Sequence, residues 1–369
     1  MLLPTFLATI PDHRRPQGRL YALGPLLLFS ILAILSDAKS YRKIQRFIQA
    51  RLPQLNALCG LHWKRAPAHT AIRYTVQGLN PTDVEVAFRH HAAVLDGPRT
   101  ELTSIAVDGK TLRGSFDRFH DQKAIQILSA LATDRTLILG HVLISAAGKS
   151  HEIPAAQQLI NELGLSGRLF TLDALHCQKK TVESVIATDN HLLVQVKANQ
   201  PTLFERLTET YPAQRPQDQH HSHEIGRHNR IEQRTTRLWE LPPGAGMEDW
   251  HNHFCTLIEV HRDTEVFDTR QKRWVPRQET AYYLSTAALS AADAAHAIRN
   301  HWGIENRSHY VRDVTLGEDA NRIRRNPGVF AMLRSFALNL LRFNDIPNIS
   351  LELYDNALDF NRLLAYKGL

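Results

Sequence analysis

The chain has 369 residues, of which 43% are hydrophobic and 22% are charged, which is enough to bury a core in each of two or three domains. Its three cysteines, Cys59, Cys177 and Cys255, are far apart and form no Cys-x-x-Cys pair, which argues against a disulfide framework and indicates a reducing compartment. The formal net charge of +7 comes entirely from residues 1–97, where 12 basic residues stand against 5 acidic ones, so this segment is the first candidate for contact with a polyanion.

Residues 1–97 are predicted to form a mostly helical domain. The apolar run from Tyr21 to Leu35 contains Gly24 and Pro25 and is shorter than the ~20 residues that span a bilayer. It therefore predicts a buried helix that begins near Pro25, and no membrane partner is expected. The turn-forming residues Asp96-Gly97-Pro98 mark the expected end of this domain.

The segment from Ser40 to Ile48 predicts a basic amphipathic helix. Its apolar residues share one face, and another face carries the cations Arg42, Lys43 and Arg46. Such a helix could lie along DNA phosphates. An ordinary solvated surface helix has the same pattern, so the charge alone leaves both possibilities open.

From residue 98 onward the hydrophobic pattern becomes that of a mixed α/β domain, expected over 98–345. The predicted order is three strands and a helix, followed by two strand-helix pairs. These elements are expected at 103–108, 122–133, 136–145, 152–163, 168–173, 176–188, 191–196 and from about 200. The order predicts a mixed sheet with helices packed against it.

Within this domain, residues 212–285 are predicted to form an insertion of antiparallel strands, with β-rich runs at 223–240, 253–261 and 273–285. A long helix is then expected from a capping-box-like start at Ser290 to about Val314. A last helix is expected at about 326–343, and residues 346–369 are expected to form a C-terminal tail.

Three carboxylates stand where phosphodiester chemistry would need them. Asp108 and Asp173 each end an apolar strand-like run, and Glu305 lies on the long predicted helix. If the two strands are neighbours, both aspartates emerge at the same edge of the sheet. Carboxylate oxygens suit Mg²⁺, and two such ions can activate a nucleophile and stabilise a leaving oxygen. The alternative is that each aspartate is an ordinary turn or capping residue.

The predicted helix around Glu305 has a polar face. His301 stands four residues before Glu305, His309 four after it and Arg312 seven after it, so α-helical spacing would place all four side chains on one side. Such a face suits a phosphate-lined cleft better than a hydrophobic core. A solvated outer face is the alternative.

Several ordered blocks of sequence carry a family resemblance. They are Ile105–Gly114, Lys149–Ile153, Thr171–Gln178, Val196–Gln200, Gly226–Glu232 and Arg299–Asn306. Together they resemble the DDE transposases of bacterial insertion sequences, specifically the H-repeat-associated subgroup, over nearly the whole chain.

The resemblance implies an RNase H-like catalytic fold whose β insertion lies between the second Asp and the Glu. It implies that Asp108, Asp173 and Glu305 form the catalytic triad and bind Mg²⁺ or Mn²⁺, two ions in all. The implied activity is cleavage at the transposon ends, after which the freed 3′-hydroxyl attacks target DNA. The implied partners are double-stranded DNA at both ends and at the target, and a second copy of the chain in the synaptic complex. The expected location is the bacterial cytoplasm, at the nucleoid.

Further contacts are expected around this triad. Four residues are predicted to contact phosphate beside the carboxylates: Lys197, His301, Asn306 and Arg312. The N-terminal cations Arg42, Lys43 and Arg46 are predicted to bind the terminal inverted repeats. The basic run Arg322, Arg324 and Arg325 is predicted to grip target DNA. For Lys197 and for this basic run, a solvated surface charge is an equal alternative.

The chain departs from the wider group at some positions. Ile298, His301 and Arg312 stand where the group has Tyr, Arg and Lys, and His151 stands where the subgroup commonly has Asn. An isoleucine cannot donate to phosphate, so the hairpin-handling role linked to that Tyr is not expected here. Three rival functions remain open: an inactive, domesticated DNA-binding regulator, an RNase H-like nuclease without strand transfer, and a zinc protein built on residues 220–224.

Overall fold

The computed structural model describes residues 2–116, 123–144, 149–211, 213–226, 230–243 and 247–369. The chain divides into two compact units. Unit 1 contains residues 1–99, 109–155 and 304–369, and unit 2 contains residues 100–108 and 156–303. The chain passes from one unit to the other inside strand β1 (Ser104–Thr111) and inside helix α7 (Lys149–Leu163). The domain boundaries predicted at residues 97/98 and 345/346 differ from this division and stay a prediction.

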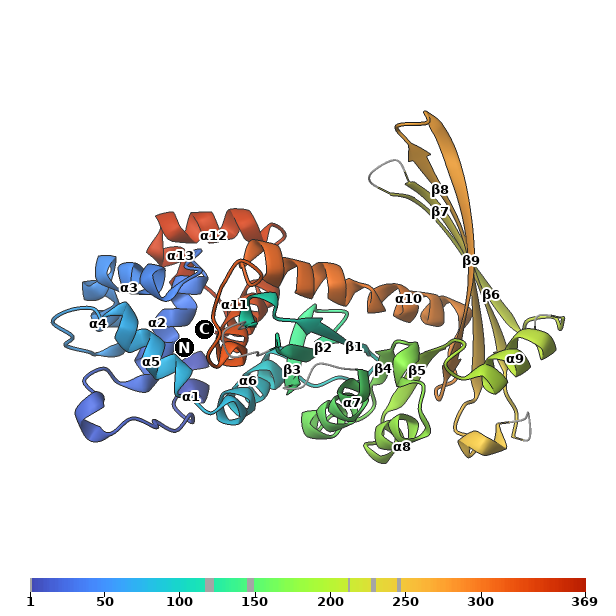
Figure 1. The fold of residues 1–369 in the computed structure, drawn as a ribbon, viewed down its shortest axis with the longest axis horizontal. Coiled ribbons are helices and arrows are strands. Elements are labelled where there is room, and N and C mark those ends of the chain that lie inside the picture. The colour runs from blue at the N-terminus through green and yellow to red at the C-terminus, as the bar shows by residue number, and fades with distance from the viewer. Residues whose placement is uncertain (1, 117–122, 145–148, 212, 227–229, 244–246) are drawn as a thin grey trace. The chain divides into compact units, whose positions relative to one another are not determined.

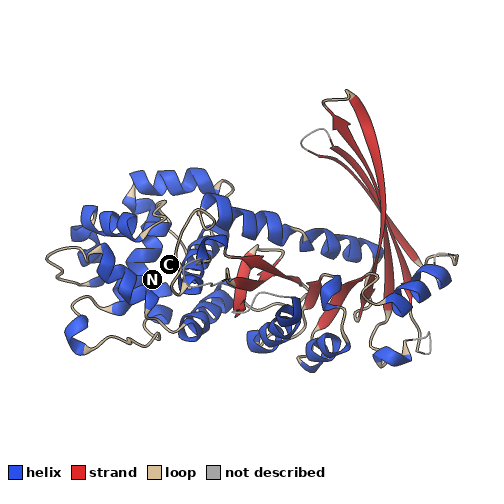
Figure 2. Ribbon diagram, viewed as in Figure 1, coloured by secondary structure: helices blue, strands red, loops and turns tan. Residues whose placement is uncertain are grey.

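Unit 1 is mostly helical (Figures 1 and 2). Its helices are α1 (Leu3–Leu7), α2 (Leu23–Ile34), α3 (Tyr41–Ala50), α4 (Leu52–Cys59), α5 (His69–Gln77), α6 (Pro81–Asp96), α11 (Pro327–Phe343), α12 (Ile349–Leu358) and α13 (Phe360–Leu364). It also contains the antiparallel strands β2 (Gln126–Ala132) and β3 (Leu137–Ile144). Strand β2 is the neighbour of β1 in the sheet. Helices α12 and α13 lie within residues 346–369, the segment predicted as a C-terminal tail.

The core of unit 1 forms where α11 packs against α2, α6 and β3. Nearly every residue of α11 is buried, and α2 is buried from Leu26 to Ile34. The buried His141 of β3 ties these elements together, because its Nδ1 contacts Glu85 of α6 at 2.9 Å and its Nε2 contacts Ser335 of α11 at 3.0 Å. Burial lowers the pKa of His141, although Glu85 raises it.

The apolar stretch near the N-terminus is a helix of this core. By length and composition, Pro16–Ile34 could cross a membrane, and a core helix meets the same test. Leu27, Phe29 and Ile31 are all fully buried within unit 1. The prediction of a buried helix beginning near Pro25 is confirmed by α2.

Unit 2 is built on a sheet with the strand order β1-β4-β5-β9-β8-β7-β6. Strand β4 (Leu169–Leu172) pairs in parallel with β1 and with β5 (His191–Val196). The other strands, β6 (Asp218–Gly226), β7 (Arg230–Glu240), β8 (Thr256–Asp268) and β9 (Arg273–Ser285), pair antiparallel, and β9 joins them to β5. Helices α8 (Lys179–Ala187) and α9 (Pro201–Thr210) follow β4 and β5 along the chain.

Helix α10 (Ala291–His301) packs against β4, β6, β7 and β8 (Figure 1). Its N-terminus is capped as predicted, because Ser290 Oγ accepts a hydrogen bond from the backbone N–H of Asp293 at 3.0 Å. Small alanines and Ile298 on its buried face form a hydrophobic cluster with Leu193 and Ile258 of the sheet. Helix α10 therefore holds a fixed position over the strands that carry the candidate site.

The predicted mixed α/β class and the antiparallel insertion are confirmed. The predicted order of strands and helices up to α9 is also confirmed, within a few residues at each end. The β-rich run expected at 223–240 is two strands, β6 and β7, so the described residues of the insertion form four strands where three runs were expected. The long helix expected to reach Val314 is not α-helical throughout. Helix α10 ends at His301, and two π-helical segments follow it, η5 (Ile304–His309) and η6 (Val311–Thr315).

Candidate active site

Asp108 and Asp173 stand at equivalent positions on two adjacent parallel strands. The ladder between β1 and β4 pairs Ser104 with Leu169 and Ala106 with Thr171. Asp108 follows Ala106 by two residues, and Asp173 follows Thr171 by two residues. Because side chains alternate between the faces of a sheet, the two carboxylates continue the same face, just beyond the last pair of the parallel ladder. This register was expected from the sequence only on the condition that the two strands were neighbours. Asp108 does not end its strand as predicted, since β1 continues to Thr111.

His301 lies close to both aspartates within unit 2. Its Nδ1 is hydrogen-bonded to Thr171 Oγ1 over 2.9 Å, which ties the C-terminal end of α10 to the face of β4 that leads to Asp173. Burial lowers the pKa of His301, while the charges of Asp108 and Asp173 and the contact with Thr171 raise it. A cavity of about 20 Å³ lies between Thr171, Asp173 and His301, which is room for about one water molecule.

His176 is a second imidazole at this edge, and sequence analysis gave it no role. It is buried, and its Nε2 lies 3.9 Å from Asp173 Oδ1. Burial lowers its pKa, whereas Asp173 and Asp108 raise it. The signal for it was present, since His176 follows Asp173 by three residues inside the block Thr171–Gln178. Two imidazoles that burial favours as neutral groups thus lie beside the two carboxylates.

The loop after β4 is held in place by local hydrogen bonds. Asp173 Oδ1 accepts from the backbone N–H of Leu175 at 3.0 Å, so this aspartate also has the capping role considered as its alternative. Asn199 Nδ2 donates to the carbonyl of Ala174 at 2.7 Å. The side chain of Asp173 remains 56% exposed, so it is accessible to a ligand.

Lys197 and Asn306 are both exposed. Lys197 follows the last residue of β5, the strand next to β4, so it belongs to unit 2 together with the two aspartates. Asn306 belongs to unit 1, where it follows Glu305 on η5. Their proposed contacts with phosphate remain predictions, as do those of the exposed Arg322, Arg324 and Arg325.

Glu305 lies on the π-helical segment η5 of unit 1 and is exposed. Single turns of π-helix are rare and occur often at functional sites. The winding of η5 is wider than that of the α-helix that the sequence predicted over these residues. The predicted single polar face is therefore corrected: His309 is buried while Glu305 is exposed.

Arg312 is fully buried in unit 1, which does not suit the contact with DNA phosphate predicted for it. Its Nε lies 3.4 Å from Glu318 Oε2. Lys110 of β1 forms ion pairs with the same Glu318 and with Asp313. Arg334 of α11 lies 3.6 Å from Glu318 Oε1. Sequence analysis missed this buried cluster because its members come from three separate segments of the chain.

Gly109 shows why a small residue follows the first aspartate. A Cβ atom placed on Gly109 would lie 2.9 Å from Glu152 Oε1, so a larger residue would displace that carboxylate. Glu152 lies in the first part of α7 and belongs to the block Lys149–Ile153. It is a fourth carboxylate near the first motif that the sequence analysis did not single out.

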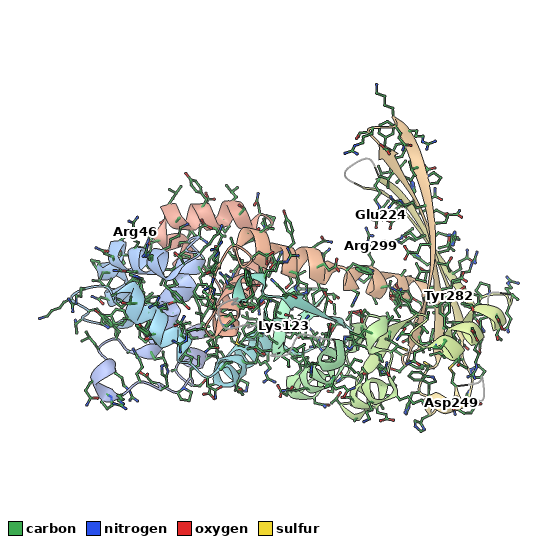
Figure 3. All side chains as sticks on the ribbon, in the orientation of Figure 1. Arg46, Lys123, Glu224, Asp249, Tyr282 and Arg299 are labelled. Carbon is green, nitrogen blue, oxygen red and sulfur yellow. The ribbon has the colours of Figure 1, made fainter. Side chains whose placement is uncertain are left out.

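The donor chemistry at the sheet edge fits a hard divalent cation, because Asp108 and Asp173 offer carboxylate oxygens from a shared edge. Within the described residues, no group of three or more His, Cys, Asp or Glu side chains is close enough to hold a metal ion. The described histidines of β6 are among these residues, so the alternative of a zinc protein built on residues 220–224 gains no support. Glu224 of β6 instead forms an ion pair with Arg299 of α10 (Figure 3).

Comparisons with known proteins agree on one family. Residues 100–341 match the family described as Transposase DDE domain, and residues 5–92 match the associated family DDE_Tnp_1-associated. "Putative protein YbfL" and "H repeat-associated putative transposase YhhI", both of Escherichia coli (strain K12), are each 30% identical over 347 residues, 91% of this chain and 89% of theirs. "Putative transposase YncI" of Escherichia coli O157:H7 is 31% identical over 355 residues, 91% of this chain and 86% of its own length.

Proposed function

Because this chain belongs to the transposase family defined by the DDE domain, we propose that it binds the inverted-repeat ends of a transposon, cuts them and joins them to target DNA. The observation that supports this most directly is the register of Asp108 and Asp173, which continue the same face of neighbouring parallel strands. A turn or capping role for each aspartate would not require them to be aligned.

Asp108, Asp173 and Glu305 are the proposed catalytic triad. Glu305 comes from η5 of unit 1, whereas the two aspartates come from unit 2. The three carboxylates would hold Mg²⁺ or Mn²⁺, and two ions would lower the pKa of the attacking hydroxyl and neutralise charge on the phosphate. The oxygen donors of Asp108 and Asp173, together with the exposure of Asp173, fit that requirement.

The surrounding residues of unit 2 would orient the site. His301, held by Thr171, and His176, beside Asp173, have pKa values lowered mainly by burial. Neutral imidazoles add no positive charge, so they leave the charge of the two carboxylates available to a cation. Lys197 on the exposed end of β5 and Asn306 on η5 are proposed to contact the phosphates of the bound DNA.

DNA is the proposed partner at three places. The exposed Arg42, Lys43 and Arg46 of α3 are proposed to contact the transposon ends, and the exposed Arg322, Arg324 and Arg325 the target. Such contacts with phosphate position a protein without selecting a sequence. Joining two ends calls for a homodimer in the synaptic complex, acting in the bacterial cytoplasm at the nucleoid.

The test is cleavage and joining of a labelled duplex that carries the transposon end, with Mg²⁺ or Mn²⁺ present. The end sequence comes from the DNA that flanks the gene. The wild-type chain should nick and join the duplex. Asp108→Asn and Asp173→Asn should lose at least about 10²-fold in rate, because each removes a carboxylate that would hold the metal ions on which the proposed cleavage depends. Glu209→Gln, at an exposed position of α9 in the same unit, is the matched control and should keep full activity.

Two outcomes would count against the proposal. Binding of the end without cleavage by the wild-type chain, in either metal, would point instead to an inactive DNA-binding regulator. Cleavage without joined products would point to a nuclease that lacks strand transfer.

A further inference from the structure

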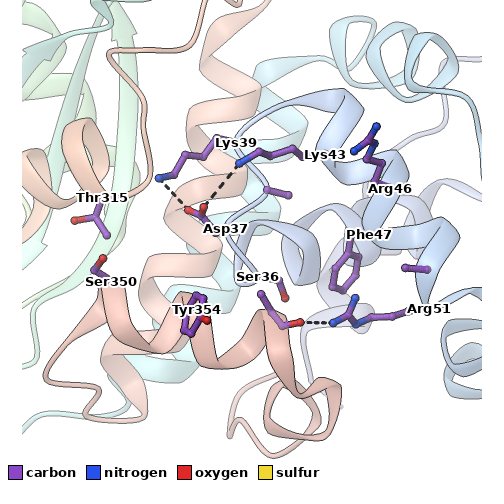
Figure 4. Close-up of a pocket in the computed structure, with 13 residues that line it drawn as sticks. Ser36, Asp37, Lys39, Lys43, Arg46, Phe47, Arg51, Thr315, Ser350 and Tyr354 are labelled. Carbon is purple, nitrogen blue, oxygen red and sulfur yellow. Dashed lines mark hydrogen bonds and ion pairs between the residues drawn. The ribbon is translucent and has the colours of Figure 1, made fainter.

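A pocket of about 570 Å³ lies within unit 1, between α3 and α12 (Figure 4). Its walls are the segment from Ser36 to Lys39, the basic face of α3, the exposed side of α12, and Thr315 at the end of η6. All of these residues belong to the same unit. The pocket therefore combines the N-terminal basic helix with a helix from the segment that the sequence suggested was a tail.

The lining of the pocket is strongly basic. It contains the four cations Lys39, Lys43, Arg46 and Arg51 and a single carboxylate, Asp37. Asp37 is shared, since Lys39 Nζ lies 2.9 Å from its Oδ1 and Lys43 Nζ lies 3.8 Å from its Oδ2 (Figure 4). One carboxylate cannot neutralise four cations, so the pocket keeps an excess of positive charge that an anionic ligand would balance.

Arg51 and Arg46 differ in the contacts that they make with the rest of the protein. Arg51 donates from Nη2 to the carbonyl of Ala357 at 2.5 Å, and its guanidinium lies 5.0 Å from the centre of the Phe47 ring. These contacts hold the Arg51 side chain in place. Its hydrogen bond links α12 to the C-terminal end of α3. Arg46, which lies on α3 (Figures 3 and 4), has no hydrogen bond or ion pair to any residue that the structure describes. Its guanidinium is available for a ligand.

The opposite wall offers an aromatic ring and hydroxyl groups. Tyr354 of α12 is 61% exposed although it lines the pocket. Ser350 and Thr315 line the same wall. An exposed ring opposite unneutralised cations is the combination that nucleic-acid-binding grooves use, in which cations follow the phosphates and an aromatic ring stacks on a base or sugar.

We propose that this pocket binds a stretch of DNA backbone from the transposon end, with phosphates against Lys43 and Arg46 and a sugar or base against Tyr354. The inference rests on the proposed function for the identity of the DNA. It goes beyond that function by adding α12 to the binding surface and by naming Tyr354, a neutral residue, as a contact.

The test measures binding of the wild-type chain and its variants to a fluorescent end duplex over a range of salt concentrations, by anisotropy without divalent metal. Arg46→Gln should weaken binding and reduce the slope of log K against log salt by about 1, because one phosphate contact is lost. Tyr354→Ala should weaken binding about fivefold or more through lost stacking, with an unchanged slope.

Each variant has a matched control. Arg65→Gln removes an equal charge from an exposed position of unit 1 outside the pocket. Leu351→Ala removes an exposed apolar side chain of the same helix, also outside the pocket. Both should bind DNA like the wild type. Thermal unfolding of all four variants establishes that they are folded.

The proposal is overturned if Arg46→Gln weakens binding no more than Arg65→Gln, or if Tyr354→Ala binds as tightly as Leu351→Ala. It is also overturned if inorganic phosphate displaces the duplex at the same phosphate concentration as unlabelled duplex does, since the pocket would then be a general anion site. The catalytic proposal can fail without this one. The pocket is still supported as a DNA-binding site if the binding pattern holds while the wild-type chain cuts no DNA.

Discussion

Glu318 is the central anion of a buried cluster in unit 1. It is only 5% exposed, and Lys110, Arg312 and Arg334, which surround it, are also buried. Burial alone raises the pKa of Glu318, but the charges of Arg312, Lys110 and Arg334 outweigh this effect and lower it from 4.5 to about 2. A buried pair of charges is costly to break, because removing one partner leaves the other unpaired in a medium of low polarity.

The pH dependence of stability should reveal this arrangement. Since the folded pKa of Glu318 is depressed, its stabilising contribution is complete above pH 4.5 and is lost as the pH falls toward 2. Glu318→Gln should lower the free energy of unfolding at pH 7 by about 3–5 kcal/mol. The difference between wild type and variant should shrink as the pH falls below 4.5. Urea denaturation at pH 7, 4.5 and 3 measures both effects.

Glu209→Gln, at an exposed position of α9, provides the comparison and should change stability little at any of these pH values. A constant difference between wild type and Glu318→Gln from pH 7 to pH 3 would contradict a depressed pKa of Glu318.

Single residues also mark the limit of prediction from sequence. The pairing of β1 with β4 entered the prediction only as a condition, since local pattern does not show which strands are neighbours. Asp108 and Asp173 themselves were predictable as candidates because each ends an apolar run. Arg312 was not, because an exposed and a buried arginine look alike in sequence. In the structure it lies among Glu318, Lys110 and Arg334, and no periodicity connects the separate segments that supply Lys110 and Arg334.

At the scale of elements, the strands and helices up to α9 were predictable because apolar runs bounded by turn residues specify them. The π-helical winding after His301 was not, since its residues have ordinary helical propensities and only tertiary contacts select the wider turn. The hairpin of β6 and β7 was missed as two strands because its strands carry many polar residues, among them His220, His221 and His223.

Helices α12 and α13 were not predicted from the sequence, which suggested only a tail for residues 346–369. They are short and follow Pro347 and Asn348, so their pattern is weak. Tertiary contacts hold them: the buried Asn356 donates from Nδ2 to the carbonyl of Leu35 at 3.0 Å and to the hydroxyl of Tyr366 at 2.7 Å. These bonds fix α12 against the end of α2, within the unit that contains both.

Asn356→Ala should therefore loosen this element. The substitution leaves the carbonyl of Leu35 without its buried donor, and the expected loss in the free energy of unfolding is about 1–3 kcal/mol. Amide hydrogen exchange should accelerate in α12 and α13 more than in α6. Asn361→Ala, at an exposed position of α13, is the control. Equal exchange rates in the two variants would show that Asn356 does not secure the helix.

At the scale of the whole molecule, the proposed synaptic complex contains two copies of the chain. Asp173→Asn should still bind DNA, because the substitution changes neither α3 nor the pocket beside it. If joined product forms only when both chains of a dimer are active, an equal mixture of wild type and Asp173→Asn at constant total concentration should retain about a quarter of the joining activity. Gel analysis of joined products measures this fraction.

A retained activity of about one half would mean that each chain joins its end independently of its partner. Glu209→Gln mixed with wild type in the same way should leave joining unchanged. This mixing experiment asks about assembly alone, since every chain present carries the same DNA-binding residues.

The register between β1 and β4 also has a consequence for how the chain tolerates insertions. Asp108 and Asp173 are each placed by their distance from the last ladder pair, Ala106 and Thr171, and not by the length of chain between them. Residues added between α7 and β4, around Gly164, would lengthen a connection at little more than the entropy of closing a longer loop. One residue added at Val107 would turn the carboxylate of Asp108 to the opposite side of the sheet.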